Sequence, residues 1–133
     1  FHKRVVYTAF SIYIILGLFI FPVFQQGGSI GYLLTPNFGY LLGMYPLIKI
    51  IDNLNNKNKL NIVNFLINGF VGIFVMHIIG ILYNFILIIY YNQFNIFLYN
   101  LGKYSVGKIG YHLIMLIPLI FLIKPIKYSK YHK

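Results

Sequence analysis

Charged residues are missing from long stretches of this chain, and their absence limits what it can fold into. Neither Val5–Phe24 nor the longer run Ile62–Tyr91 contains a Lys, Arg, Asp or Glu. A helix needs about 20 apolar residues to cross a hydrocarbon core about 30 Å thick. A soluble domain of 133 residues, 59% of them hydrophobic, could not bury this much apolar surface. We therefore predict an all-α integral membrane helical bundle that forms a single domain over residues 1–133.

Four apolar segments are predicted to cross the membrane. The second segment is short and is interrupted by Pro46, so we expect a bent or partly embedded helix there. The third segment is longer than a usual span, which favours one tilted crossing. The four segments are Val5–Phe24, Gly39–Ile51, Ile62–Tyr91 and Ile109–Ile123.

The basic residues follow a positive-inside pattern. If the first residue is cytoplasmic and the four segments alternate in direction, every Lys and Arg except Lys103 and Lys108 falls on or near the cytoplasmic side. We therefore predict a multi-pass protein of the plasma or inner membrane with both ends cytoplasmic. Basic loops that contact anionic membrane lipid account for the net charge of +10, and no nucleic-acid partner is predicted.

Residue types that carry catalysis or bind metals are scarce. Asp52 is the one carboxylate side chain, and the chain has no cysteine. These two facts exclude paired-carboxylate catalysis, disulfides and thiolate metal sites. His77 has no second ligand at a metal-site spacing, so we expect it to be a hydrogen-bonded packing residue. We predict no enzyme activity, no cofactor and no metal.

The loop Gln25–Phe38 carries neutral polar groups. It is uncharged and rich in glycine, and Gln25, Gln26 and Asn37 provide hydrogen-bond donors and acceptors. A plain turn between two helices explains this composition. The alternative is a lid over a ligand, because irregular backbone at membrane depth is tolerated where it packs in protein or lines a cavity.

A second polar group precedes the last apolar segment. Lys108 and His112 are four residues apart and therefore share a helix face, with Tyr111 beside Lys108. A cation near the end of a membrane helix either reaches the headgroup region or holds an anionic ligand. Both interpretations are open from spacing alone.

The run FPVFQQGGSIGYLLTPNFGYLLGMYPL, at positions 21–47, resembles the signature of the BioY family. That signature is a hydrophobic helix ending in Pro-Val-Phe, a glycine-rich loop, and a Gly-Pro-Thr-Gly-Gly-Tyr-Leu-x-Gly-Phe segment that opens the next helix. Thr35, Asn37 and Phe38 depart from the family's Gly, Thr and Gly. Downstream, His77–Phe85 is similar to the family's Gly-x-x-Trp/Tyr stretch. The positions that match in order and spacing are Pro22, Val23, Phe24, Gly27, Gly28, Pro36, Gly39, Tyr40, Leu41 and Gly43.

BioY proteins are the substrate-binding S components of energy-coupling-factor vitamin transporters, specific for biotin. The resemblance implies that this chain captures a small vitamin in an outward-facing pocket. It also implies two kinds of partner, a coupling membrane subunit and a pair of ATPases. Family members have six membrane helices, so we expect this chain to correspond to the last four.

One family motif is altered. The family carries Gly-Asp-x-x-Lys at the start of its last helix, and this Asp and Lys are assigned to the ring and the carboxylate of biotin. In the best register Gly107 matches the glycine, Lys108 replaces the acid and Tyr111 replaces the lysine. Lys108 can still pair with a ligand carboxylate, while Asn37, Gln26 or Tyr111 would hold the ureido ring. The predicted ligand-binding residues are Gln25, Gln26, Asn37, Tyr40, Lys108, Tyr111 and His112.

Three functional hypotheses follow. The leading one is a vitamin-capturing S component, with biotin as the ligand. The second is the same scaffold with a different small molecule, which the replacement of the acid by Lys108 favours. The third is a structural subunit of a larger membrane complex, such as an organelle-encoded respiratory component. A composition typical of AT-rich codons agrees with the third, but the matching pattern over Pro22–Gly43 does not.

Overall fold

The computed structural model describes residues 3–24, 27–57, 62–118 and 121. Helices account for most of these residues, and the described part contains no β-strand. The predicted all-α class is confirmed. The elements are α1 (Lys3–Phe19), the 3-10 helix η1 (Ile30–Leu34), α2 (Pro36–Lys57), α3 (Ile62–Tyr91), α4 (Phe94–Asn100), the π-helical segment η2 (Leu101–Val106) and α5 (Gly107–Ile114).

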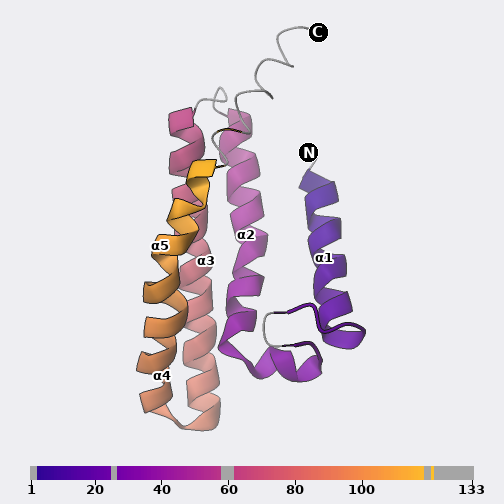
Figure 1. Cartoon of the computed structure of the whole chain (residues 1–133), viewed down its shortest axis with the longest axis vertical. Coiled ribbons are helices and arrows are strands. Elements are labelled where there is room, and N and C mark those ends of the chain that lie inside the picture. The colour runs from indigo at the N-terminus through magenta and orange to yellow at the C-terminus, as the bar shows by residue number, and fades with distance from the viewer. Residues whose placement is uncertain (1–2, 25–26, 58–61, 119–120, 122–133) are drawn as a thin grey trace, which may run out of the picture.

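The helices run alternately up and down (Figure 1). The start of α1, the end of α2 and the end of α5 lie at one end of the molecule. The turn between α3 and α4 lies at the opposite end, and the start of α2 also points toward that end. The segments α4, η2 and α5 follow one another without a break, so they form a single rod beside α3.

Close packing joins α2 to α3, because glycines allow the two backbones to approach. A Cβ atom added at Gly43 would lie 2.7 Å from the carbonyl oxygen of Met76, which is too close for any side chain. A Cβ at Gly80 would overlap the ring of Tyr40 in the same way. Small residues at such positions are typical of helix pairs in membranes.

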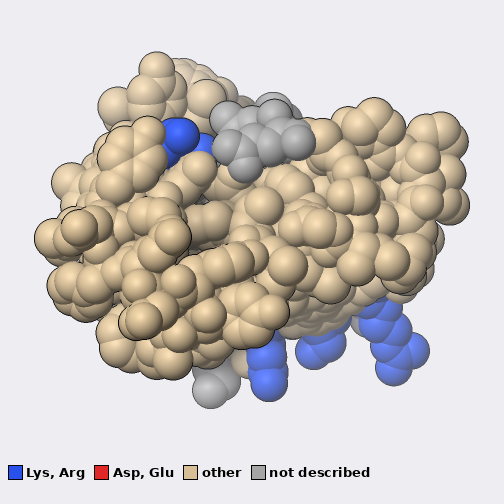
Figure 2. Space-filling model, turned by 90° about the horizontal axis from the view of Figure 1, so that it is seen from below, with Lys and Arg blue, Asp and Glu red and all other residues tan. Residues whose placement is uncertain are grey.

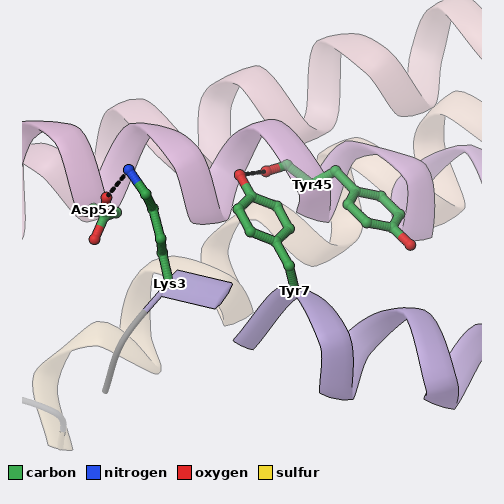
Figure 3. A network of polar contacts seen from close by, with 4 residues as sticks. All are labelled: Lys3, Tyr7, Tyr45 and Asp52. Atoms are coloured by element: carbon green, nitrogen blue, oxygen red, sulfur yellow. Dashed lines mark hydrogen bonds and ion pairs between the residues drawn. The ribbon is translucent and has the colours of Figure 1, made fainter. Parts of the chain in front are cut away.

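Two polar contacts tie the start of α1 to α2 (Figure 3). The Lys3 ammonium lies 3.4 Å from the Asp52 carboxylate, and the Tyr7 hydroxyl donates to the Tyr45 carbonyl oxygen at 3.2 Å. The one carboxylate side chain of the sequence is therefore paired at the end of α2.

The surface of the helices is apolar, as lipid requires. The described residues leave large hydrophobic side chains exposed along the helices, among them Ile15 on α1, Phe74 and Ile89 on α3, and Leu98 on α4. By length and composition, α3 is the one described helix that qualifies as a span, with a mean hydropathy of 2.3 in its best window. These features and the all-helical architecture agree with the membrane protein that the sequence predicts.

The predicted boundaries of α3 are confirmed at both ends, whereas the first two segments and the start of the last segment differ from the prediction. The predicted end of the last segment, Ile123, lies outside the described residues. The first helix ends at Phe19, and the chain turns before Phe24, which is buried against Gly17. The second helix is longer than Gly39–Ile51. It starts at Pro36, where the missing N–H costs nothing, and it continues through Pro46.

The largest correction concerns residues 94–106, which the sequence analysis left outside the last crossing. They are helical, so the last rod begins at Phe94 and not at Ile109. The polar residues of this stretch suggested a loop. One of them, Asn100, is buried, and its amide nitrogen donates to the side-chain oxygen of Asn84 on α3 at 3.2 Å. A polar group that finds its partner inside the bundle does not interrupt a helix.

Candidate ligand-binding site

A cavity of about 210 Å³ lies between the turn after α1 and the helices α2, α3 and α5. It brings together three parts of the chain that are distant in sequence. Aromatic and apolar groups dominate its wall, and a few polar groups converge on it, as is usual for small-molecule sites. The lining residues are Tyr13, Phe24, Tyr32, Asn37, Tyr40, Leu41, Met44, Met76, Tyr104, Lys108 and His112.

Four of the predicted ligand-binding residues line this one cavity, namely Asn37, Tyr40, Lys108 and His112. Gln25 and Gln26 lie outside the described residues. The structure does not bring Tyr111 to the cavity, because its side chain is 70% exposed. Successive helix residues are about 100° apart, so a helix that turns His112 toward the bundle points Tyr111 away from it.

Aromatic rings close one side of the cavity. The rings of Phe24 and Tyr32 lie 4.4 Å apart between centroids, and Tyr13 meets Phe24 edge-on at 5.4 Å. Tyr32 lies on η1, outside the membrane-spanning helices, and burial raises the pKa of its phenol. This hydroxyl therefore stays protonated at neutral pH and leaves the wall uncharged.

Asn37 supplies a buried amide to the cavity wall beside Tyr32. The residue is second in α2, where Pro36 starts the helix, and it is buried. Its Nδ2 atom has no hydrogen-bond partner among the described residues. The Asn37 amide also lies within hydrogen-bonding influence of the Tyr32 hydroxyl, and its NH2 group keeps donor capacity that a ligand acceptor could use.

Lys108 makes this cavity electropositive. Its ammonium lies 5.5 Å from the ring centroid of Tyr104, over the ring face. No carboxylate side chain lines the cavity, because Asp52 is the only one in the sequence. Asp52 follows Asn37 by fifteen residues on α2, which separates them by about 22 Å along the helix. An anionic ligand would therefore meet Lys108 without competition from an acid of the chain.

Figure 2 shows the molecule from the end that carries the α3–α4 turn. This face is largely free of charged side chains, and no Asp or Glu is visible on it. The Lys and Arg side chains project from one edge, and a further basic group lies in a recess. A mostly neutral face with sparse positive charge does not repel a small anion.

At the wall of the cavity, His112 forms a pair with His77 that the sequence analysis did not foresee. His77 on α3 is 3% exposed, and its Nε2 atom lies 3.0 Å from Nδ1 of His112 on α5. The ring of Tyr40 packs edge-on against His77 at 5.5 Å. His77 is thus a hydrogen-bonded packing residue, as predicted. Its partner is 35 residues away, and no spacing in the sequence indicated it.

The π-helical segment η2 adds two residues that sequence reasoning missed. Its buried Tyr104 lines the cavity, and the hydroxyl of buried Ser105 is hydrogen-bonded to the hydroxyl of Tyr40. A π-helical turn holds one more residue than an α-helical turn and often occurs at functional sites. Here it links α2 to the rod that carries Lys108.

Comparisons with known proteins point to one family. A model of the BioY family matches residues 2–122. The chain is similar to a probable biotin transporter BioY of Lysinibacillus sphaericus, 34% identical over 70 residues, which cover 50% of this chain and 34% of that protein. It is also 30% identical over 66 residues, 50% of this chain, to an uncharacterized 21.2 kDa protein in the psbX-ycf33 intergenic region of Cyanophora paradoxa, of which 35% is covered. The match thus spans about a third of each curated relative, and no solved structure matches the chain.

Proposed function

The chain belongs to the BioY family, and from this premise we propose that it captures a small anionic vitamin, with biotin as the first candidate. A BioY-type transporter subunit is the class that the family supports, and it is not an enzyme family. The ligand and the capture site are the proposal.

The observation that carries the proposal is one cavity in which Asn37 and Lys108 converge and no carboxylate takes part. Biotin has a carboxylate at one end and a ureido ring at the other. Lys108 would bind the carboxylate through a charge-assisted hydrogen bond. The unpartnered Nδ2 of Asn37 would donate to the ureido oxygen, and the aromatic wall around Tyr32 would cover the ring.

Transport in this proposal needs other proteins. The chain contains no glycine–lysine loop of the kind that holds nucleotide phosphates, so energy would come from an ATPase pair acting through a coupling membrane subunit. We place the start of α1 and the end of α5 on the cytoplasmic side, because they share one end of the bundle with Lys3 and Arg4. The cavity then opens toward the outer face.

The direct test compares biotin with its uncharged carboxamide. Both ligands are titrated into the purified full chain in lipid nanodiscs, and binding is measured by calorimetry and by the shift in thermal unfolding. We expect biotin to bind and Lys108→Met to weaken it at least tenfold, because a charge-assisted bond contributes about 1.5–3 kcal/mol. The same substitution should change carboxamide binding less than threefold.

Three results would count against this proposal. An equal loss for both ligands would show that Lys108 only anchors the helix at the interface. No response to biotin together with a response to another vitamin would favour the second candidate, a scaffold adapted to a different molecule by Lys108 in place of the family's acid. If no vitamin binds and the chain purifies in a fixed ratio with other membrane subunits, the structural hypothesis is preferred.

A further inference from the structure

The contact between His77 and His112 determines where each ring can carry its proton. A neutral imidazole has one N–H and one acceptor nitrogen. His77 Nε2 and His112 Nδ1 are 3.0 Å apart, so one of them donates and the other accepts. The other nitrogen of His77, Nδ1, is buried and has no hydrogen-bond partner among the described residues.

These facts favour one of the two arrangements. If His112 Nδ1 were the donor, His77 would carry its own proton on Nδ1, where it would be a buried N–H without an acceptor. If His77 Nε2 is the donor, only a lone pair stays unmatched at His77 Nδ1. Buried N–H groups without partners are rarer and more costly than unmatched acceptors. His77 therefore donates, and a neutral His112 carries its proton on Nε2.

The surroundings of the pair favour two neutral rings. The titratable groups that face it are Tyr40 from α2, Tyr104 from η2 with Lys103 behind its ring at 5.3 Å, and Lys108 one turn before His112 on α5. Tyr13 and Tyr32 reach the same cavity from α1 and η1. All of these are phenols or amines. A protonated imidazole would thus face a like charge with no carboxylate to balance it.

We propose that His77 is a positioning residue that fixes His112 as an Nε2–H donor to the captured ligand. His112 lines the cavity while its Nδ1 is engaged by His77, so its Nε2–H is the group left for ligand acceptors. Lys108 and His112, four residues apart on one helix face, would then bind a ligand carboxylate with one charged and one neutral donor. This inference rests on the proposed function for its ligand and on the histidine geometry for its mechanism.

The first experiment needs no ligand. The full chain, with ¹⁵N-labelled histidine in nanodiscs at pH 7.5, is examined by solid-state NMR of the imidazole nitrogens. We expect His112 to be protonated on Nε2 alone, with Nδ1 as a hydrogen-bond acceptor. His77→Leu should give a mixture of His112 tautomers, and His77→Gln should restore the single one, because its amide N–H can donate from a similar position. A proton on His112 Nδ1 in the native chain, or a single unchanged tautomer in His77→Leu, would overturn the proposal.

The second experiment measures biotin affinity in the same three proteins and in Asn84→Leu. Asn84→Leu is a matched control. Like His77→Leu, it removes a buried polar side chain from α3, but Asn84 does not line the cavity. In His77→Leu, His112 loses the group that positions its donor, so the affinity for biotin should fall about tenfold. His77→Gln and Asn84→Leu should stay within threefold of the native affinity.

The outcomes of the affinity experiment separate this inference from the proposed function. Equal weakening in all three variants, or none in His77→Leu while the native chain binds biotin, would reject the positioning role alone. If the native chain binds no biotin, the proposed function fails, and the NMR spectrum still decides how His77 fixes His112.

Discussion

At the scale of single residues, two buried asparagines differ in how the protein satisfies their side chains. The Nδ2 atom of Asn37 is buried without a partner, whereas the Asn84 side chain, also buried, accepts a hydrogen bond from Asn100. The two residues are chemically identical, so their partners determine how each contributes. Asn84 contributes to the fold, and we assign Asn37 to the site.

This contrast makes a prediction about stability. Asn37→Leu should leave the thermal midpoint of the ligand-free protein unchanged or raise it, because it removes a buried donor that has no partner. Asn84→Leu should lower the free energy of unfolding by about 1–3 kcal/mol, because it leaves the Asn100 amide unmatched. Thermal unfolding in nanodiscs, with and without biotin, measures both. A drop for Asn37→Leu as large as for Asn84→Leu would mean that Asn37 is structural.

At the residue level, the sequence singled out groups of distinctive chemistry that the structure places on the cavity. Lys108 and His112 stood out because a charged and a polar residue at helical spacing are rare in an apolar segment. Tyr32 and Tyr104 could not be singled out, since thirteen tyrosines are spread through the chain and only the fold selects those that face the cavity. The pairing of His77 with His112 depends on α3 and α5 lying side by side, which no local pattern encodes.

At the scale of elements, the rod α4–η2–α5 sets the position of the basic end of the site. Its lower part contacts α3 through Asn84 and Asn100, away from the cavity, and its middle, beside the cavity, is held by the hydrogen bond between Tyr40 and Ser105. The π-helical segment includes Ser105 and supplies one extra residue per turn compared with an α-helix, and its Tyr104 lines the cavity together with Lys108.

Removing one residue from η2 should therefore disrupt binding more than folding. Deleting Gly102 should convert the π-helical segment to an α-helix and shift Tyr104 and Ser105 around the helix axis. The helices α4 and α5 should nearly keep their relative orientation, because five α-helical residues turn through about the same angle as six π-helical residues. We expect the helix content by circular dichroism to persist and the biotin-induced thermal shift to disappear. Gly102→Ala is the control, because an added Cβ meets no atom within 4 Å, and alanine should preserve binding. An undiminished thermal shift in the deletion variant would contradict the role of η2.

The ends of a helix could be predicted where they coincide with the ends of an apolar run in the sequence. This held for α3, a run that ends at polar residues on both sides. The same rule overextended α1, because the apolar residues after Phe19 form a turn that packs Phe24 on Gly17. It also missed residues 94–106, whose polar side chains include one that pairs inside the bundle.

At the scale of the whole molecule, the up-and-down order of the rods gives a directional prediction. The chain has no native cysteine, so single cysteines can report which side of the membrane each end occupies. In intact cells, Ile30→Cys should react with a membrane-impermeant thiol reagent, because Ile30 is 57% exposed at the end opposite the start of α1. Lys57→Cys, at the end of α2, should react only after permeabilisation. The reverse labelling pattern would show that the protein has the opposite orientation to the one proposed.

The Lys3–Asp52 ion pair has a consequence for release, if the chain captures an anion as we propose. The one acidic side chain of the sequence is held toward the far end of α2, so no internal carboxylate could displace a bound anion from Lys108. Release would then require the groups that line the cavity to separate from one another.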